Sequence, residues 1–254
     1  MMGEPAAPER FDWERAPAQV RAVGDEVHVW RASCRLTATE ILTLRRLLSD
    51  DELERAKRFH FARDRDHYTA ARAALRVILG RYLNLPPAGL RFKYNSFGKP
   101  TLDGGAGGLR FNLSHSGGLA LYAVALGREV GVDVEHLKDE MDGGVAERFF
   151  SPSEVAALRS LAPEAQKRAF FDCWTRKEAY IKARGEGLSL PLDSFDVSVA
   201  PDEPAALLRT RDDAGEASRW TLHELSPGPG YAAALAVEGG DWRLRCWRWE
   251  MGAC

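Results

Sequence analysis

Apolar and polar positions along this chain follow two different periods, which predict both strands and helices. Segments of strand-like alternation lie at 26–34, 109–114, 119–126, 129–135, 194–200, 219–225, 231–239 and 242–250. Segments with apolar residues every three or four positions, typical of helices, lie at 37–59, 63–85, 151–161 and 164–187. The chain therefore belongs to the α+β class.

The order of these segments predicts a division into two parts. Helical segments precede strands in both halves, and "KRF" at 57–59 is echoed by "ERFF" at 147–150. We therefore expect an N-terminal tail over 1–24, one α+β half over 25–126 and a second half over 127–254.

Turn residues refine this prediction between and after the strands. Turns at 116–118 and 127–128 predict that the three strands between 109 and 135 form a meander. The stretches 136–144 and 201–218 are predicted to be loops.

Composition and charge exclude several classes of protein. The chain has 254 residues, 45% hydrophobic and 28% charged, and lacks an apolar run long enough to span a membrane. A formal net charge of −2 does not favour nucleic acid or an anionic membrane as a partner. The four cysteines are scattered and form no C-x-x-C pair, so we expect no zinc site, no disulfide framework and a cytoplasmic location.

The segment "VGVDVE" at 130–135 places two acids close together. The alternation puts its valines on one face of a strand and Asp133 and Glu135 on the other. Two carboxylates at neighbouring positions of one face repel each other. Open water, a basic partner or a metal ion would each relieve that repulsion.

The helical segment "FFDCWTRKEAYIKARG" carries a second pattern. Phe171, Trp174, Glu178 and Lys182 fall along one stripe, so the two charged residues continue an aromatic, core-facing line. The alternative reading is an ordinary surface pair at i,i+4, worth about 0.2–0.5 kcal/mol.

Three further segments carry groups suited to phosphate. In "FNLSHSGG", Ser114 and His115 end a strand before a Ser-Gly-Gly turn, whose amides and side chains suit an anion. "SFGKP" presents Lys99 from a tight turn, and Arg63 stands at the start of a helical segment. The alternative readings are a plain hairpin turn and solvated surface cations. Together with the acids, these groups suit Mg²⁺ and a phosphate-rich ligand better than zinc, which prefers His or Cys.

"GKP", "FNLSHSGG", "VGVDVE" and "FFDCWTRKEAYIKARGEGLSLPL", in this order, resemble the signatures of the Sfp-type 4′-phosphopantetheinyl transferases. The resemblance spans about residues 26 to 238. It implies two similar α+β halves related by a pseudo-twofold axis, with coenzyme A in the cleft between them. It also implies Mg²⁺-dependent transfer of the phosphopantetheine arm of CoA to a serine of an acyl, peptidyl or aryl carrier protein, with release of 3′,5′-ADP.

The resemblance also implies roles for individual residues. Asp133, Glu135 and Glu178 correspond to the metal ligands, and Glu178 is also the base for the carrier serine, with a metal-bound water as the alternative base. Lys182 corresponds to the group that assists the leaving phosphate. The residues that correspond to CoA contacts are Arg63, Lys99, Ser114, His115, Asp133 and Lys182.

The family implies polyketide or non-ribosomal peptide synthesis as the pathway served. We expect a monomer, because one chain contains both halves. Two other functions compete with this one: a Mg²⁺-dependent nucleotidyl transferase or nucleotide hydrolase, and a non-catalytic relative that binds CoA or a carrier protein. The chain has no Walker A or Rossmann glycine pattern to support a nucleotide enzyme. A binding module alone has no need for Asp133, Glu178 and Lys182 together.

Overall fold

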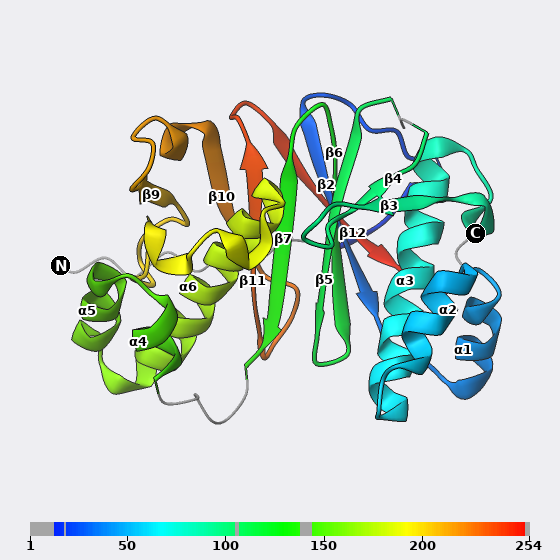
Figure 1. The fold of residues 1–254 in the computed structure, drawn as a ribbon, viewed down its shortest axis with the longest axis horizontal. Helices are drawn as coiled ribbons and strands as arrows, with labels where there is room; N and C mark the ends of the chain where they lie inside the picture. Colours follow the sequence, from blue (N-terminus) through cyan, green and yellow to red (C-terminus); the bar gives the residue numbers. More distant parts are fainter. Residues whose placement is uncertain (1–12, 18, 105–106, 138–143, 252–254) are drawn as a thin grey trace. The chain divides into compact units, whose positions relative to one another are not determined.

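The computed structural model describes residues 13–17, 19–104, 107–137 and 144–251. The chain divides into two compact units. We call the described residues between 13 and 127, with 242–251, the N-terminal unit, and the described residues between 128 and 241 the C-terminal unit. Each unit contains both helices and sheet, which confirms the mixed α+β prediction (Figure 1).

The N-terminal unit is built on a five-stranded sheet of order β1-β12-β2-β6-β5. Its elements are β1 (Glu14–Arg15), β2 (Glu26–Ser33), α1 (Ala38–Arg45), α2 (Asp50–Lys57), α3 (Ala62–Leu83), η1 (Pro87–Gly89), β3 (Phe92–Tyr94), β4 (Pro100–Leu102), β5 (Leu109–Ser116), β6 (Leu119–Leu126) and β12 (Arg243–Trp249).

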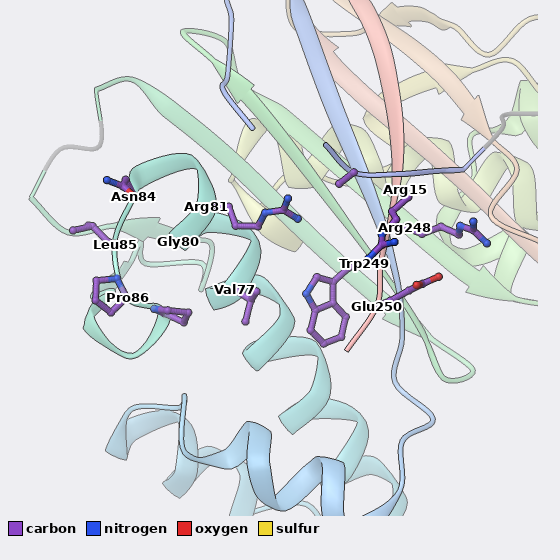
Figure 2. A pocket seen from close by; sticks show the side chains of 12 residues that line it. Arg15, Val77, Gly80, Arg81, Asn84, Leu85, Pro86, Arg248, Trp249 and Glu250 are labelled. Carbon is purple, nitrogen blue, oxygen red and sulfur yellow. The ribbon is translucent and has the colours of Figure 1, made fainter. Parts of the chain in front are cut away.

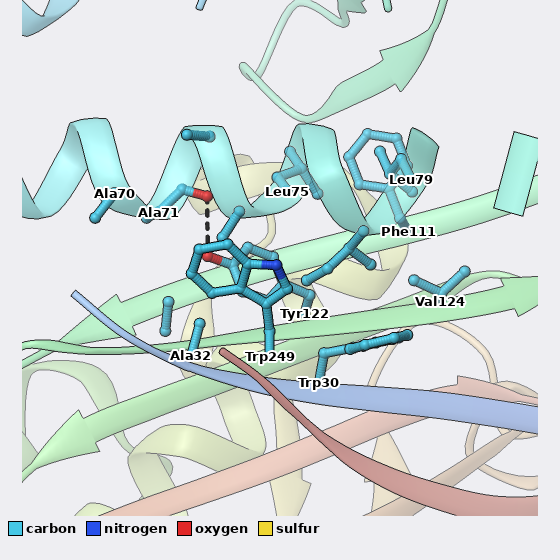
Figure 3. Close-up of a cluster of buried hydrophobic side chains, with 14 of the residues drawn as sticks. Trp30, Ala32, Ala70, Ala71, Leu75, Leu79, Phe111, Tyr122, Val124 and Trp249 are labelled. Atoms are coloured by element: carbon cyan, nitrogen blue, oxygen red, sulfur yellow. Dashed lines mark hydrogen bonds between the residues drawn. The ribbon is translucent and has the colours of Figure 1, made fainter. Parts of the chain in front are cut away.

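The core of this unit lies between α3 and the sheet. Figure 3 shows Ala71 and Leu75 of α3 facing Trp30, Tyr122 and Trp249 of the strands. The buried Tyr122 hydroxyl donates a hydrogen bond of 2.9 Å to the Ala71 carbonyl, so its polar atom is satisfied inside the apolar layer.

The C-terminal unit is built on a three-stranded antiparallel sheet of order β10-β11-β7. Its elements are β7 (Val130–His136), α4 (Val145–Phe149), α5 (Pro152–Ser160), α6 (Pro163–Arg184), η2 (Gly187–Ser189), η3 (Leu192–Ser194), β8 (Phe195–Val197), β9 (Leu207–Thr210), η4 (Glu216–Arg219), β10 (Trp220–Leu225) and β11 (Tyr231–Glu238). Helix α6 packs on one face of this sheet, mainly against β7 and β11.

A buried ion pair ties α2 to α3 in the N-terminal unit. Ser49 and Glu52 form a capping box at the start of α2, and the Glu52 carboxylate accepts a 2.6 Å hydrogen bond from Arg76 of α3. The Arg76 guanidinium also donates to the carbonyls of Pro87 and Leu90, at 3.0 and 2.9 Å. The Arg76 side chain thus links α2 and α3 to the segment that follows α3.

The C-terminal unit repeats this arrangement with different residues. Ser151 and Glu154 form the capping box of α5, and the Lys177 ammonium of α6 lies 2.8 Å from Glu154. Lys177 also donates to the carbonyls of Leu192 and Phe195, both at 2.7 Å. Both long helices have 22 residues, and each ends in a left-handed residue. The two halves are therefore similar in construction, as predicted.

The structure differs from the sequence predictions in strand pairing. The predicted meander is wrong: β7 pairs with β11, while β5 and β6 pair with each other in the other sheet. Strand β12 pairs with β2 and lies in the N-terminal unit, although we expected all of 127–254 in the second half. Residues 14–15 of the expected tail form β1 on β12.

Two helix and loop predictions also differ. The helical segment 37–59 forms two helices, because Ser49 caps a new start at α2. The predicted loop at 201–218 contains β9 and η4, whereas residues 138–143 of the predicted loop at 136–144 lie outside the described residues. No helix among the residues that the structure describes is long and apolar enough to cross a membrane.

Candidate active site

The predicted acid pair lies on β7, under helix α6. A glycine at 131 allows the helix to approach, since a Cβ there would lie 2.1 Å from the Ala179 carbonyl oxygen and 2.4 Å from the Ala183 nitrogen. The strand alternation puts Asp133 and Glu135 on the same face as Gly131. Both acids therefore lie on the face that packs against α6; the sequence pattern predicts only that they share one face of the strand.

Asp133 forms an ion pair with α6. The Lys182 ammonium lies 2.5 Å from Oδ1 of Asp133, and the Asp133 side chain is 4% exposed against 28% for Lys182. The helical spacing by itself also allows a surface pair between Lys182 and Glu178. The structure instead directs Lys182 from the helix to the strand.

Glu178 lies one helical turn before Lys182 and is half-buried. Burial raises the pKa of Glu178, and the negative charges of Asp133 and Glu135 raise it further, whereas Lys182 lowers it. Electrostatic interactions therefore link the four predicted residues of the C-terminal unit, which are Asp133, Glu135, Glu178 and Lys182.

The donor chemistry of this group fits a hard cation. Mg²⁺ takes carboxylate oxygens, keeps several waters and usually needs only one or two protein carboxylates besides phosphate oxygens. Burial is the main cause of the raised pKa of Glu178, and the negative charges of Asp133 and Glu135 add to it; a bound cation would oppose the effect of those charges. Within the described part of the chain, however, no three His, Cys, Asp or Glu side chains are already arranged to hold a metal ion.

Trp174, on the same stripe, has a structural role. Its ring packs on Phe149, Phe150 and Phe170, with centroid distances of 5.8, 6.4 and 6.2 Å. The contacts with Phe149 and Phe150 hold α6 against the C-terminal end of α4.

The N-terminal unit holds the predicted phosphate-binding groups on a strand end and two loops. Ser114 and His115 are adjacent on β5, so their side chains point to opposite faces; Ser114 is buried and His115 exposed. Lys99 is half-buried and follows a turn in which Oδ1 of Asn95 accepts hydrogen bonds from the amides of Phe97 and Lys99.

Arg63 lies in the first turn of α3, where it is exposed and pairs with Asp64 at 3.0 Å. Burial lowers the pKa of the nearby His67, and the positive charges of Arg63 and Arg35 lower it further. Arg63 and Arg35 therefore both contribute positive electrostatic potential around His67.

Arg35 is a residue that sequence reasoning missed. Its guanidinium donates a 2.8 Å hydrogen bond to the Gly117 carbonyl, and a Cβ on Gly118 would lie 2.5 Å from its Nε. It therefore lies directly on the turn that follows His115. No local pattern could have indicated this, because only the pairing of β2 with β6 brings Arg35 to that turn.

A separate hollow of about 720 Å³ lies elsewhere in the N-terminal unit (Figure 2). Its lining includes Val77, Gly80, Arg81, Leu85 and Trp249. None of the predicted site residues lines it, so we do not associate it with the site described above.

The sequence matches two known family descriptions over most of its length. Residues 129–236 match the 4′-phosphopantetheinyl transferase superfamily, and residues 30–126 match the N-terminal region of a 4′-phosphopantetheinyl transferase. The 4′-phosphopantetheinyl transferase HetI of Nostoc sp. is 41% identical over 240 residues, which cover 93% of this chain and 98% of HetI.

This chain therefore belongs to the 4′-phosphopantetheinyl transferase family of enzymes. Its relatives also include the transferase Sfp of Bacillus subtilis, 32% identical over 155 residues that cover 61% of this chain and 68% of Sfp. A mouse relative, L-aminoadipate-semialdehyde dehydrogenase-phosphopantetheinyl transferase, is 28% identical and covers 84% of this chain and 75% of its own length. The predicted Sfp-type assignment is confirmed.

Proposed function

We propose that this protein transfers the 4′-phosphopantetheine arm of coenzyme A to a serine of an apo carrier protein, in a reaction that requires Mg²⁺. The carrier is an acyl, peptidyl or aryl carrier protein of polyketide or non-ribosomal peptide synthesis. The protein acts as a monomer in the cytoplasm.

One observation carries this proposal. Lys182 reaches from α6 to Asp133 on β7 at 2.5 Å, and Glu178 lies one turn earlier within the field of Asp133 and Glu135. A base and a cation on one helix, facing two acids on a strand, suit the attack of a hydroxyl on a phosphoanhydride, with a phosphate as the leaving group.

The proposed step exchanges one bond to phosphorus for another. The carrier serine oxygen attacks the phosphorus that bears the pantetheine arm, and the bond from that phosphorus to the bridging oxygen of 3′,5′-ADP breaks. Glu178 accepts the serine proton, and its raised pKa favours that acceptance. Lys182 places its positive charge beside the departing phosphate, whose negative charge grows as the bond breaks.

Asp133, Glu135 and Glu178 would hold Mg²⁺. When bound, the ion neutralises charge on the pyrophosphate of CoA. Asp133 also keeps Lys182 in place, because the ion pair fixes the ammonium over β7.

Lys99, Ser114, His115 and Arg63 would bind the 3′-phosphate of CoA or its surroundings. The turn after β5 supports this role, because Arg35 adds a guanidinium next to His115. Arg forks and exposed turn amides both bind phosphate oxygens well. The cleft that the resemblance implies for CoA stays a prediction.

Intact-protein mass spectrometry tests the proposal directly. An apo carrier protein is incubated with this protein, CoA and Mg²⁺, with and without EDTA. We expect the carrier to gain the mass of one phosphopantetheine arm, and the gain to disappear with EDTA. Absence of any gain on acyl and peptidyl carriers, with CoA binding still measurable, would favour the non-catalytic relative.

A further inference from the structure

The Arg72 side chain of α3 connects the interior of the N-terminal unit to the hairpin of β3 and β4. Arg72 is buried, and its guanidinium donates two hydrogen bonds to Oε1 of Glu52, one of them at 2.8 Å. The same guanidinium donates a third hydrogen bond, of 3.0 Å, to the hydroxyl of Tyr94 at the end of β3. A buried cation that a carboxylate already fixes therefore holds the side chain of an exposed tyrosine.

The hairpin depends on such support. Strands β3 and β4 have three residues each and pair only with each other. A two-stranded hairpin by itself is marginally stable in water. The guanidinium groups of Arg72 and Arg76 lie 4.7 and 5.2 Å from the ring centroid of Phe92, which fixes the start of β3 on α3. The hydrogen bond from Arg72 to Tyr94 fixes the end of β3 on the same helix.

The loop that follows Tyr94 carries Lys99. Its centre is Asn95, whose amide donates to the Lys99 carbonyl at 3.1 Å and whose carbonyl accepts from the Gly98 amide at 3.0 Å. Oδ1 of Asn95 accepts from two further loop amides, at 3.0 and 2.9 Å. Pro100, directly after the loop, pairs in register with Tyr94. Tyr94 therefore adjoins both ends of the loop, one along the chain and one across the hairpin.

The two long helices allow a comparison within one chain. Lys177 has the same position in its 22-residue helix as Arg76 has in α3, and each pairs with the glutamate of a capping box. The Lys177 ammonium lies 4.3 Å from the ring centroid of Phe195, the first residue of β8. Arg76 lies over Phe92, the first residue of β3, in the same way. The cation, the phenylalanine and the strand that it begins are therefore common to both units.

Arg72 and Tyr94 have no counterpart in this shared construction. One turn before the shared cation, α3 has Arg72 where α6 has the buried Cys173. At the end of the strand, β3 has Tyr94 where β8 has the buried Val197. In the C-terminal unit one lysine is enough to pair with the buried glutamate. The additional arginine is thus not required by the common construction, and it occurs in the unit whose hairpin carries Lys99.

We propose that Arg72 is a positioning residue for coenzyme A, because through Tyr94 it holds the loop 95–99 in the conformation in which Lys99 meets the 3′-phosphate. This inference rests on the proposed function, which assigns Lys99 to that phosphate. A lysine side chain is long and flexible, so its charge is placed well only if its backbone is fixed. Ordering the loop before the ligand arrives lowers the entropic cost of binding.

The substitution Tyr94→Phe tests this role in the full chain. It removes the hydroxyl and keeps the ring, the backbone and the charge of Arg72. Isothermal titration calorimetry measures the dissociation constants for CoA and for dephospho-CoA, which lacks the 3′-phosphate. We expect Tyr94→Phe to weaken CoA binding about fivefold, the effect of one hydrogen bond, and dephospho-CoA binding by less than about twofold. If Tyr94→Phe binds CoA as wild type does, the proposal is overturned.

Tyr122→Phe is the matched control. The Tyr122 hydroxyl also bonds to α3, at 2.9 Å from the Ala71 carbonyl, but it does so in the core (Figure 3). Both variants therefore lose one hydrogen bond between a tyrosine and the same helix. We expect Tyr122→Phe to lower the melting temperature and to leave both dissociation constants unchanged. If Tyr122→Phe weakened CoA binding as much as Tyr94→Phe does, the effect would be one of overall stability, and the proposal would be overturned.

A double-mutant cycle with Lys99 tests how Tyr94 acts. If Tyr94 acts through Lys99, adding Tyr94→Phe to Lys99→Ala should weaken CoA binding no further. Additive losses would mean that the hydroxyl contacts CoA itself, which would overturn the positioning role.

Hydrogen exchange in the free protein reports on the loop directly. The amides of Phe97, Gly98 and Lys99 should exchange faster in Tyr94→Phe than in wild type or Tyr122→Phe, because the loop opens more often. Equal exchange rates in all three proteins would contradict the positioning role.

The binding measurements separate this inference from the proposed function, because they need neither carrier protein nor turnover. If wild type adds nothing to an apo carrier, yet Tyr94→Phe weakens the binding of CoA and not of dephospho-CoA, the positioning role stands and the proposed activity fails. If wild type modifies the carrier and Tyr94→Phe binds CoA normally, the activity stands and the positioning role fails.

Discussion

Lys182 on α6 and Asp133 on β7 form an ion pair of 2.5 Å, with the Asp133 carboxylate nearly removed from solvent. This pair fixes the register of the helix over the strand at the point where Glu178 faces Asp133 and Glu135. The bond therefore joins the two sequence motifs that lie 49 residues apart into one site.

We predict that Glu178→Gln lowers the transfer rate at least about a hundredfold, because it removes the proposed base and a metal ligand. The same variant should unfold at an equal or higher temperature without metal. The pKa of Glu178 is raised in the folded protein, so its ionisation destabilises the fold as pH rises above the unfolded value of about 4.5. The glutamine side chain cannot ionise, so the variant does not lose this stability. Steady-state kinetics and thermal melting at pH 7 without metal provide the check.

Glu164→Gln is the matched control for that prediction. Glu164 is an exposed acid in the first turn of the same helix, so its loss should leave turnover unchanged. Near-normal turnover in Glu178→Gln would contradict the assigned role.

We predict that Asp133→Asn lowers the rate and raises the Mg²⁺ concentration needed for half-maximal activity. The amide is a weaker ligand for a hard cation, and it also loses the ionic partner of Lys182. Activity is titrated with Mg²⁺ in wild type and variant. An unchanged titration curve would show that Asp133 is not a ligand.

We predict that Lys99→Ala and His115→Ala weaken the binding of CoA more than the binding of dephospho-CoA. Dephospho-CoA lacks the 3′-phosphate, so the lost contacts have no counterpart there. The KM values for both substrates provide the comparison. Lys93→Ala is the control, because Lys93 lies on the adjacent hairpin strand and already pairs with Asp103 at 2.7 Å. Equal losses for the two substrates would remove the proposed 3′-phosphate contact.

We predict that Lys177→Met destabilises the protein by about 3–5 kcal/mol, because it leaves the buried Glu154 carboxylate without its cation. Urea unfolding measures the difference. Lys57→Met is the control, since Lys57 and Glu54 form an exposed pair that should contribute nothing measurable. Equal stability of Lys177→Met and wild type would show that the buried Glu154 carboxylate does not depend on Lys177.

We predict that the protein loses stability as pH falls below about 6.5, in part through His28. Burial lowers the pKa of His28, against the opposing effect of Glu26, so the folded state holds the ring neutral. A group with a lowered pKa binds fewer protons when folded, so stability falls from its unfolded pKa down to the folded one. His28→Gln should lose less melting temperature between pH 7.5 and 5.5 than wild type does. An equal loss would show that other groups cause the acid sensitivity.

Much of the candidate site follows from local periodicity. Alternation along "VGVDVE" places Asp133 and Glu135 on one face, and the helical repeat aligns Glu178 with Lys182. Ser151 and Pro152 correctly predict the start of α5. These patterns depend only on backbone geometry and on neighbours within a few residues, so one segment is enough to show them.

Tertiary structure alone decided which segments are neighbours. The periodicity of β7 predicts its faces, but its pairing with β11 depends on contacts about a hundred residues away. The same holds for β12 on β2, and for Arg35 on the turn after His115. Strand periodicity specifies the side on which a residue lies, whereas the partner strand is selected by the packing of the whole sheet and its helices.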